Sequence, residues 1–246
     1  MTDPVEIHVL DKQVRLLQPE KGFRTSLDTV LLAAACPAKG GQRVLDMGCG
    51  VGGVLYCLAH RVFGLVLTGV EMQTDYIALA RENSVLNDVD PVPSFILSDI
   101  RDFAVAEPAQ RFDHVLCNPP FLEAGHHVPA QDEGRAKALG HKDTDMDVAG
   151  WVDAGFRNLK SGGTLTMIHR ADAVDRIIRA LGQRFGAVEI IPVYSRAGDS
   201  AKRVIVRAVK DRKSPATLYG GIVLHEADGS YTPAADKILR GGGPVL

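Results

Sequence analysis

The residues best suited to chemistry follow an apolar run at 112–117: Asn118, Pro119, Pro120 and Phe121. A carboxamide oxygen and a nearby backbone carbonyl can accept the two N–H groups of a planar exocyclic amine, while an aromatic ring stacks on the base that carries it. Prolines stiffen the backbone that sets this geometry. The pattern predicts methyl transfer to a planar nitrogen, with these four residues as candidate catalytic groups. The alternative is a rigid turn after a strand, with the aromatic ring in the core.

A second candidate site lies upstream, where an apolar strand runs into a glycine-rich turn and then a helix. Such turns bring the backbone close to a ligand. Asp46 precedes glycines at 48, 50 and 52, which differs from the G-x-G-x-x-G fingerprint of dinucleotide enzymes, although Gly53 completes that fingerprint from Gly48. The turn predicts a cofactor site, and it leaves an NAD-dependent dehydrogenase open as an alternative.

The segments around both motifs alternate between strand and helix patterns. Such alternation is typical of parallel strands and predicts a Rossmann-like, doubly wound α/β sheet of seven strands, the last of them antiparallel. The expected strands are 43–47, 65–71, 93–98, 112–117, 163–168, 187–194 and 202–210, and the expected helices are 52–62, 73–87, 100–106, 148–159 and 171–184.

The sequence predicts one domain over 1–246, with the sheet at 41–213. In the N-terminal part, 1–40, we expect a hairpin of strands 6–10 and 13–18 and a helix over 26–36, capped by Ser26 or Thr25 and stopped by Pro37. A C-terminal extension covers 214–246, and we expect its Gly241-Gly242-Gly243 to be frayed.

Two acidic residues stand at the expected ends of the second and third strands. Ligands of doubly wound sheets bind outside the carboxyl ends of the strands. Glu71 is therefore a candidate to bind a ribose diol, and Asp99 to accept from an adenine amino group, with the backbone N–H of Ile100 donating to the ring. Taken alone, each acid also fits a helix cap or a solvated loop.

Composition restricts the class of protein. The 246 residues are 46% hydrophobic and 24% charged, which suits one large α/β domain. The first residues lack a secretory signal, the apolar stretches are too short to span a membrane, and we expect a cytoplasmic protein. Four cysteines without C-x-x-C spacing indicate reduced packing residues, and His126-His127 lacks a third ligand, so no metal is expected.

The net charge of −2 hides an uneven distribution. Residues 1–159 hold 14 basic and 22 acidic side chains, whereas residues 160–213 hold 12 basic and 5 acidic ones. Seven of these basic residues form a run close together in the sequence: Arg196, Lys202, Arg203, Arg207, Lys210, Arg212 and Lys213. A basic face that includes Arg196, Lys202 and Arg203 predicts contacts to RNA phosphates. The alternative is that this run only solvates the outer face of a strand. The polar stretch 122–147 is either a loop that orders over substrate or an ordinary surface loop.

Together these motifs resemble the class I S-adenosylmethionine-dependent methyltransferases that carry N-P-P-F/Y, over about residues 22–210. Segments 18–32 and 224–232 look like those of the bacterial tRNA adenine-N6 methyltransferases. The resemblance implies that 118–121 receive the target amine, which attacks the cofactor's methyl group in line. It implies a cofactor site formed by Arg24, Asp28, Asp46, Gly48, Gly50, Glu71, Met72, Asp99, Ile100 and Asn118, with Arg24 and Asp28 on a helix that closes over the methionine end.

Within the same chemistry, rRNA guanine-N2 and the amide nitrogen of a protein glutamine remain alternative acceptors, because their pockets are almost identical. A non-catalytic RNA-binding module is the alternative from a different class. The intact Asn-Pro-Pro-Phe at 118–121 weighs against it.

Overall fold

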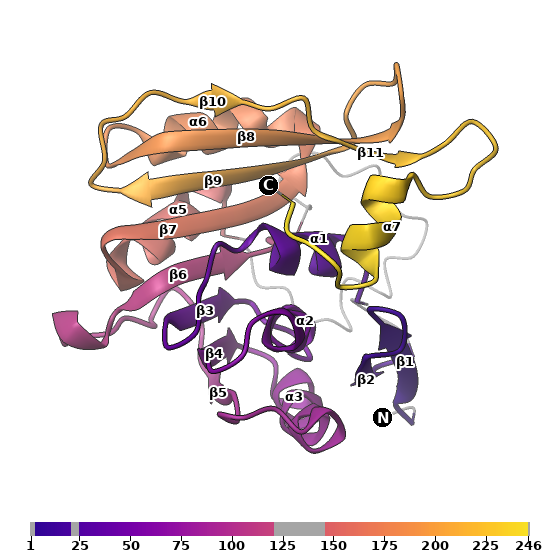
Figure 1. Cartoon of the computed structure of the whole chain (residues 1–246). Coiled ribbons are helices and arrows are strands. Elements are labelled where there is room, and N and C mark those ends of the chain that lie inside the picture. Colours follow the sequence, from indigo (N-terminus) through magenta and orange to yellow (C-terminus); the bar gives the residue numbers. More distant parts are fainter. Residues whose placement is uncertain (1–2, 21–24, 121–145, 246) are drawn as a thin grey trace, which may run out of the picture.

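A computed structural model describes residues 3–20, 25–120 and 146–245 of the chain (Figure 1). In this part a nine-stranded sheet has the order β10-β8-β9-β7-β6-β3-β4-β5, with β11 beside β8, and β1 and β2 form a separate hairpin. The strands are β1 (Val5–Val9), β2 (Val14–Gln18), β3 (Arg43–Met47), β4 (Val66–Glu71), β5 (Ser94–Leu97), β6 (Phe112–Cys117), β7 (Leu159–Arg170), β8 (Phe185–Arg196), β9 (Arg203–Lys210), β10 (Thr217–Leu218) and β11 (Ile222–His225).

Strand direction brings the sequence motifs to one edge of the sheet. β3 pairs in parallel with β4 and β6, β4 with β5, and β6 with β7. β9 runs antiparallel between β7 and β8, so β8 points the same way as the parallel strands. We call the side where β3 to β8 end, and where β9 begins, the carboxyl edge. The doubly wound sheet with its antiparallel last strand is confirmed, and β10 and β11 extend it beyond the seven expected strands.

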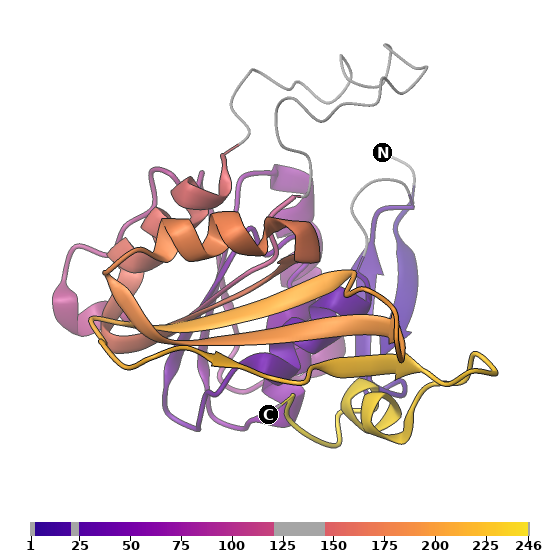
Figure 2. The same cartoon turned by 90° about the horizontal axis from the view of Figure 1, so that it is seen from above.

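Helices cover both faces of the sheet, as Figure 2 shows. One hydrophobic cluster joins the sheet to α1, α2 and α3, and the other joins it to α5 and α6. Neighbouring strand residues alternate between the two clusters, as Val44 and Leu45 do, because successive side chains of a strand point to opposite faces. The helices are α1 (Leu27–Ala35), α2 (Gly53–Arg61), α3 (Thr74–Asn87), η1 (Pro108–Gln110), α5 (Val148–Asn158), η2 (Ala171–Ala173), α6 (Val174–Leu181) and α7 (Pro233–Leu239).

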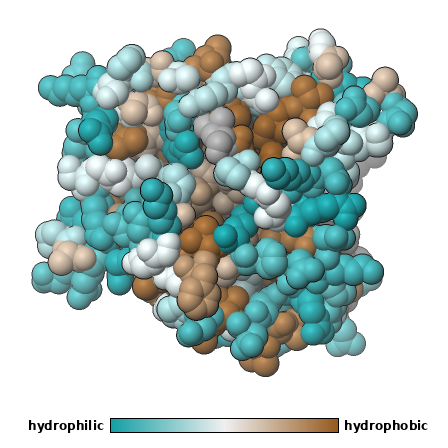
Figure 3. All heavy atoms as spheres, viewed as in Figure 1, coloured by the Kyte–Doolittle hydropathy of each residue, from teal (hydrophilic) through white to brown (hydrophobic). Residues whose placement is uncertain are grey.

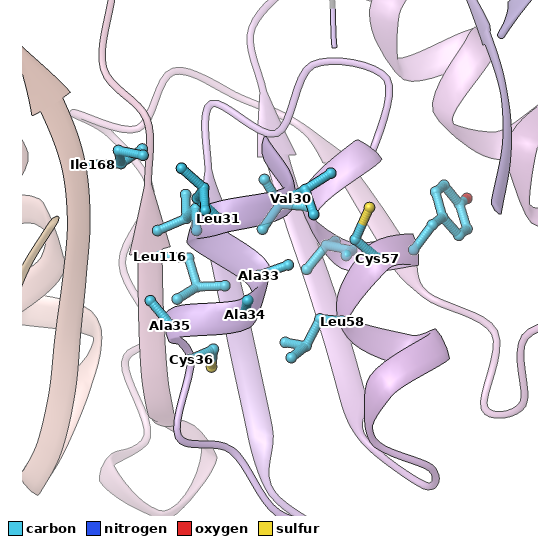
Figure 4. Packing of buried hydrophobic residues seen from close by; sticks show 14 of the residues in the cluster. Val30, Leu31, Ala33, Ala34, Ala35, Cys36, Cys57, Leu58, Leu116 and Ile168 are labelled. Atoms are coloured by element: carbon cyan, nitrogen blue, oxygen red, sulfur yellow. The ribbon is translucent and has the colours of Figure 1, made fainter. Parts of the chain in front are cut away.

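Helix α1 is buried from Asp28 to Ala35. Its apolar side chains meet α2 and the sheet, where Leu116 and Ile168 lie (Figure 4). Ser26 caps it as expected: its hydroxyl accepts from the N–H of Asp28 at 3.3 Å, and its own N–H donates to the hydroxyl of Thr29. A helix enclosed in this way is held by its surroundings more than by its own propensity.

The helix expected at 100–106 is wrong. The backbone forms a turn at Asp99 and then continues without helical structure to η1. The reason is the buried Asn158 at the end of α5, whose side chain accepts from the N–H of Val105 at 3.0 Å and donates to the carbonyl of Phe103 at 3.2 Å. These long-range bonds take the place of helical ones.

The expected fraying of the C-terminal glycines is also wrong. The N–H of Gly242 donates to the carbonyl of Lys237 at 2.9 Å, and the Arg61 guanidinium donates to the carbonyl of Gly243 at 2.7 Å. The N–H of Val245 then donates to the carbonyl of Ala34 at 3.1 Å, so the tail and α7 lie beside α1 (Figure 1). Polar groups on α1 and α2 thus hold a segment whose own sequence favours disorder.

On the face drawn in Figure 3, hydrophilic residues predominate and hydrophobic ones form separate small areas. No helix within the described residues has the length and apolar character required to cross a lipid bilayer.

Candidate active site

The glycine-rich turn after β3 folds back onto the end of β4. The N–H groups of Gly48 and Cys49 both donate to the carbonyl of Val70, at 2.8 and 3.0 Å. Gly48 has φ +68°, and a Cβ there would lie 2.9 Å from the Trp151 ring, so only glycine fits. Gly50 has φ +53°. The two glycines therefore allow the tight turn that follows β3 and folds back onto the end of β4.

Glu71 ends β4 with its carboxylate held by backbone groups. One oxygen accepts from Gly50 N–H at 3.1 Å, and the other accepts from the N–H groups of Met72 at 2.9 Å and Gln73 at 3.0 Å. A carboxylate oxygen has two lone pairs, so the oxygen facing Gly50 keeps one for a hydroxyl donor. This preorganised acceptor fits the expected role of binding a ribose.

Asp46 and Asn118 present buried acceptor atoms to one hollow. The Oδ2 of Asp46 and the Oδ1 of Asn118 are both enclosed and have no hydrogen-bond partner among the described residues. Burial, and then the nearby charge of Glu71, raise the pKa of Asp46 well above its ordinary range. Buried acceptors without partners are rare, and they indicate that a ligand supplies the missing donors or positive charge.

This hollow opens to solvent. Its wall is formed by the glycine turn, the starts of α2 and α3, the N-terminal turn of α1 and the end of β6. The lining residues are Thr25, Thr29, Asp46, Gly48, Cys49, Val51, Gly53, Val54, Tyr76 and Asn118. The turn motif and the Asn-Pro-Pro motif, more than 60 residues apart in the sequence, thus share one cavity, because β3 and β6 are neighbours in the sheet.

The rest of the Asn-Pro-Pro-Phe motif is only partly described. Pro119 is buried and Pro120 is exposed. Phe121 and Arg24 lie outside the described residues, as do His126, His127 and nearly all of the stretch 122–147. Their expected roles therefore remain predictions.

After the end of β5, Asp99, which is expected to contact the adenine, is bound by the neighbouring Arg101. The Arg101 guanidinium and its backbone N–H both bind the Asp99 carboxylate, the latter at 2.8 Å, and these bonds lower the pKa of Asp99. Ile100 is buried, whereas Met72 at the end of β4 is 62% exposed. All three lie at the carboxyl edge, as the sequence predicts, and their contacts to a cofactor remain predictions.

The Asp28 side chain, expected at the cofactor, forms an ion pair with Arg203. Its carboxylate accepts from Nε of Arg203 at 2.9 Å, and the Asp28 side chain is only 9% exposed. The sequence assigned Asp28 to the cofactor and Arg203 to RNA phosphates, but the two side chains bind each other. Arg196 and Lys202 are exposed at the same edge of the sheet.

Other members of the basic run point inward or lie elsewhere. Arg207 pairs with Glu189 and also donates to the carbonyl of Ala35 at 2.9 Å. Lys210 is buried and donates to two backbone carbonyls on α5 and β7, and its burial lowers its pKa. Arg212 and Lys213 are exposed beyond the other end of β9. The basic run therefore forms neither one continuous surface for RNA phosphates nor one solvent-exposed face of a strand.

Sequence reasoning missed three residues at the site. Trp151 lies in the core on α5, and its ring also packs against the Gly48 turn, while its buried Nε1 has no hydrogen-bond partner among the described residues. Thr25, just before α1, and Thr29, in its first turn, also line the hollow. The available signal was the polar Thr29 within a helix that is otherwise apolar after Asp28. The four cysteines are buried free thiols, consistent with packing.

Comparison with known proteins agrees with this geometry. Residues 24–133 match the family model of the methyltransferase small domain. The protein is a methyltransferase. A tRNA1(Val) (adenine(37)-N6)-methyltransferase from Shewanella baltica is 28% identical to it over 93% of this chain and 95% of its own length. One with the same name from Haemophilus influenzae is 25% identical over the same shares.

A solved structure extends the similarity to the fold of nearly the whole methyltransferase. A "predicted O-methyltransferase" from Agrobacterium tumefaciens has a TM-score of 0.72 at 25% identity, covering 88% of this chain and 97% of its own. The names of these relatives differ in the atom that is methylated. The residues at the end of β6 bear on that choice.

Proposed function

We propose that this methyltransferase transfers a methyl group from S-adenosylmethionine to the exocyclic N6 amine of adenine in tRNA. The observation that carries the proposal is the buried, unpartnered Oδ1 of Asn118 in the same hollow as the unpartnered Oδ2 of Asp46. An amine supplies the N–H donor that the carboxamide oxygen lacks, whereas a hydroxyl acceptor would call for a base to remove its proton. The two acceptors thus favour nitrogen over oxygen as the atom methylated.

The residues of the hollow fit the cofactor. Glu71 offers a lone pair to a ribose hydroxyl, and Asp46 offers an unpaired carboxylate oxygen at the glycine turn. When bound, S-adenosylmethionine supplies an electrophilic methyl group on a positively charged sulfur. The buried Asp46 carboxyl group in the hollow and the Glu71 carboxylate behind the glycine turn suit such a cation, because burial strengthens electrostatic attraction.

The chain's own contribution is positioning and electrostatics. Asn118 Oδ1 and the carbonyl of Pro119 accept the two N–H groups, which leaves the amine lone pair directed at the methyl group for in-line attack. The acceptors also stabilise the positive charge that the nitrogen gains. No basic residue is needed at the reacting atom, since the methylated amine is strongly acidic and loses its proton to solvent afterwards.

The choice of tRNA rests on the names of the relatives and on surface charge. Arg196 and Lys202 are exposed at the carboxyl edge, where they can contact phosphates without occupying the hollow. Arg203, expected to join them, is only partly exposed and is engaged by Asp28. We propose that the whole chain works as one methyltransferase domain and acts on tRNA in the cytoplasm.

The test is incubation of the protein with labelled S-adenosylmethionine and separate tRNA, ribosomal RNA and protein fractions, followed by nucleoside and amino-acid analysis. We expect label in N6-methyladenosine of the tRNA fraction. Label in N2-methylguanosine of ribosomal RNA or in a glutamine side chain would overturn the proposed substrate. RNA binding without any label would favour the non-catalytic module. The Asn118→Ala variant is the control for methylation by contaminating enzymes.

A further inference from the structure

The position of α1 sets one wall of the hollow. Thr25, just before the helix, and Thr29, in its first turn, face Asp46 and Asn118 across the cavity. The N–H of Thr25 is also fixed, because it donates to the side chain of Gln18 at 2.9 Å. A shift of this turn would therefore change the width of the cofactor site.

Two arginines of β9 reach α1 at opposite ends. Nε of Arg203 donates to Oδ2 of Asp28 in the first turn, and Nη1 of Arg207 donates to the carbonyl of Ala35 in the last, each at 2.9 Å. Residues four apart on a strand share a face and lie ~13 Å apart. Residues seven apart on a helix lie ~10 Å apart, two turns along one side. The spacing on β9 thus matches the spacing on α1.

The Asp28–Arg203 pair has the properties of a positioning contact. The Asp28 side chain is 9% exposed and that of Arg203 is 34% exposed, so the pair is shielded more than an ordinary surface ion pair. For comparison, the pair of Arg179 and Asp175 on α6 is 77% and 52% exposed. Partial burial makes an ion pair specific in geometry and makes the loss of one partner costly.

We infer that Arg203 is a positioning residue for cofactor binding: through Asp28 it fixes the first turn of α1, and with it Thr25 and Thr29. Arg207 holds the far end of the helix, away from the hollow. The inference goes beyond the proposed function, which gives no role to this pair, and uses it only in choosing S-adenosylhomocysteine as the probe.

The experiment measures the Kd of S-adenosylhomocysteine by calorimetry, well below the unfolding temperature, for the full-length wild type and six variants. Arg203→Met and Asp28→Asn should each weaken binding about 5- to 20-fold. The double variant should bind no more weakly than the weaker single variant, because both changes break the same contact. Arg203→Lys, which keeps the charge, should recover most of the affinity.

Two matched variants separate positioning from general stability. Arg207→Met removes a more buried arginine, with its bond to the other end of α1 and its pair with Glu189, so it should lower Tm at least as much as Arg203→Met does while changing Kd less than twofold. Arg179→Met removes an exposed arginine from an aspartate pair and should change neither quantity. If Arg203→Met does not fold, the Kd values of Asp28→Asn and Arg203→Lys are compared with that of the wild type instead.

Three results would overturn the inference while the wild type binds the probe. One is an unchanged Kd in Arg203→Met with a raised KM for tRNA, which would make Arg203 a phosphate contact. Another is additive losses in the double variant, which would make Asp28 a direct cofactor ligand. The third is equal loss of affinity in Arg203→Met and Arg207→Met, as expected from stability alone. Absence of binding to the wild type would instead refute the proposed function.

Discussion

Replacing Asn118 with alanine should lower the turnover strongly while leaving the free energy of unfolding nearly unchanged. In most buried positions an asparagine contributes hydrogen bonds to the folded state. The Oδ1 atom of Asn118 makes none to the described residues, so its burial costs about 1–3 kcal/mol that the bound amine recovers. Removing the side chain relieves that cost and gives up some packing, and we expect the free energy of unfolding to change by less than about 1 kcal/mol.

The same change should remove most of the turnover. The carboxamide accepts from a nitrogen that becomes positively charged in the transition state, and loss of one preorganised hydrogen bond of this kind lowers kcat by about 100- to 1,000-fold. The Kd of S-adenosylhomocysteine should remain within about threefold of wild type, because the probe has no target amine.

Asn83 offers a matched control. It is fully buried, and its side chain accepts from the N–H of Leu17 at 2.7 Å and donates to the carbonyls of Leu17 and Val51, each at 3.1 Å. At about 1 kcal/mol for each bond, Asn83→Ala should lose about 3 kcal/mol and lower Tm by about 6–12 °C. The assays are thermal unfolding and single-turnover methylation. The reasoning is refuted if Asn118→Ala unfolds as early as Asn83→Ala or keeps more than a tenth of wild-type turnover.

Three further changes test the cofactor site. Glu71→Gln should weaken S-adenosylhomocysteine binding about tenfold or more by calorimetry, since the amide cannot serve Gly50, Met72 and Gln73 as acceptor at both ends; an unchanged Kd would remove this residue from the site. Asp46 has a pKa raised by burial, so its contribution to stability is fully present below the unfolded pKa of about 3.9 and is lost as pH rises toward the folded value. Asp46→Asn should therefore unfold at a higher temperature than wild type at pH 7 and at the same temperature near pH 3.5; a lower Tm at pH 7 would contradict this. Gly48→Ala should lose at least about 1–2 kcal/mol from its positive φ and from contact with Trp151, and an unchanged Tm in denaturation followed by the fluorescence of this single tryptophan would show that the turn adapts.

Most of the fold could be predicted, because the strands and helices of the sheet have regular hydrophobic patterns and short connections. The segment 100–106 could not, since its structure depends on Asn158, a residue more than 50 positions away. The prediction for the C-terminal tail was wrong for the same reason, because the order of the tail depends on Arg61 and on the backbone of α1. Local patterns predict what a segment prefers, but they do not show which distant polar group will bind it.

The site could be predicted where its functional residues belong to short sequence motifs at the ends of strands. Asp46 lies near the end of β3, Glu71 ends β4 and Asn118 follows β6, so the direction of the parallel strands alone brings them to one edge. Arg203 was assigned to RNA because charge density along the chain does not reveal which side chains point inward, and Asp28 was assigned to the cofactor only through the family resemblance. On β9, alternation places Arg203 and Arg207 toward α1, and that face is visible only once the helix is known to cover it.

The backbone hydrogen bonds of the glycine-rich turn after β3 distinguish the two cofactors that the glycine pattern left open, a dinucleotide and S-adenosylmethionine. A pyrophosphate needs free backbone N–H groups at the turn, as in dinucleotide-binding folds. Here the N–H groups of Gly48 and Cys49 donate to Val70, and that of Gly50 donates to Glu71. A phosphate charge ~4 Å from the Glu71 carboxylate would be repelled by about 4 kcal/mol at an effective dielectric constant of 20. At these residues a cation with hydroxyl donors meets the Glu71 carboxylate, whereas a pyrophosphate would meet that carboxylate and three occupied amides, which favours a sulfonium cofactor over a dinucleotide.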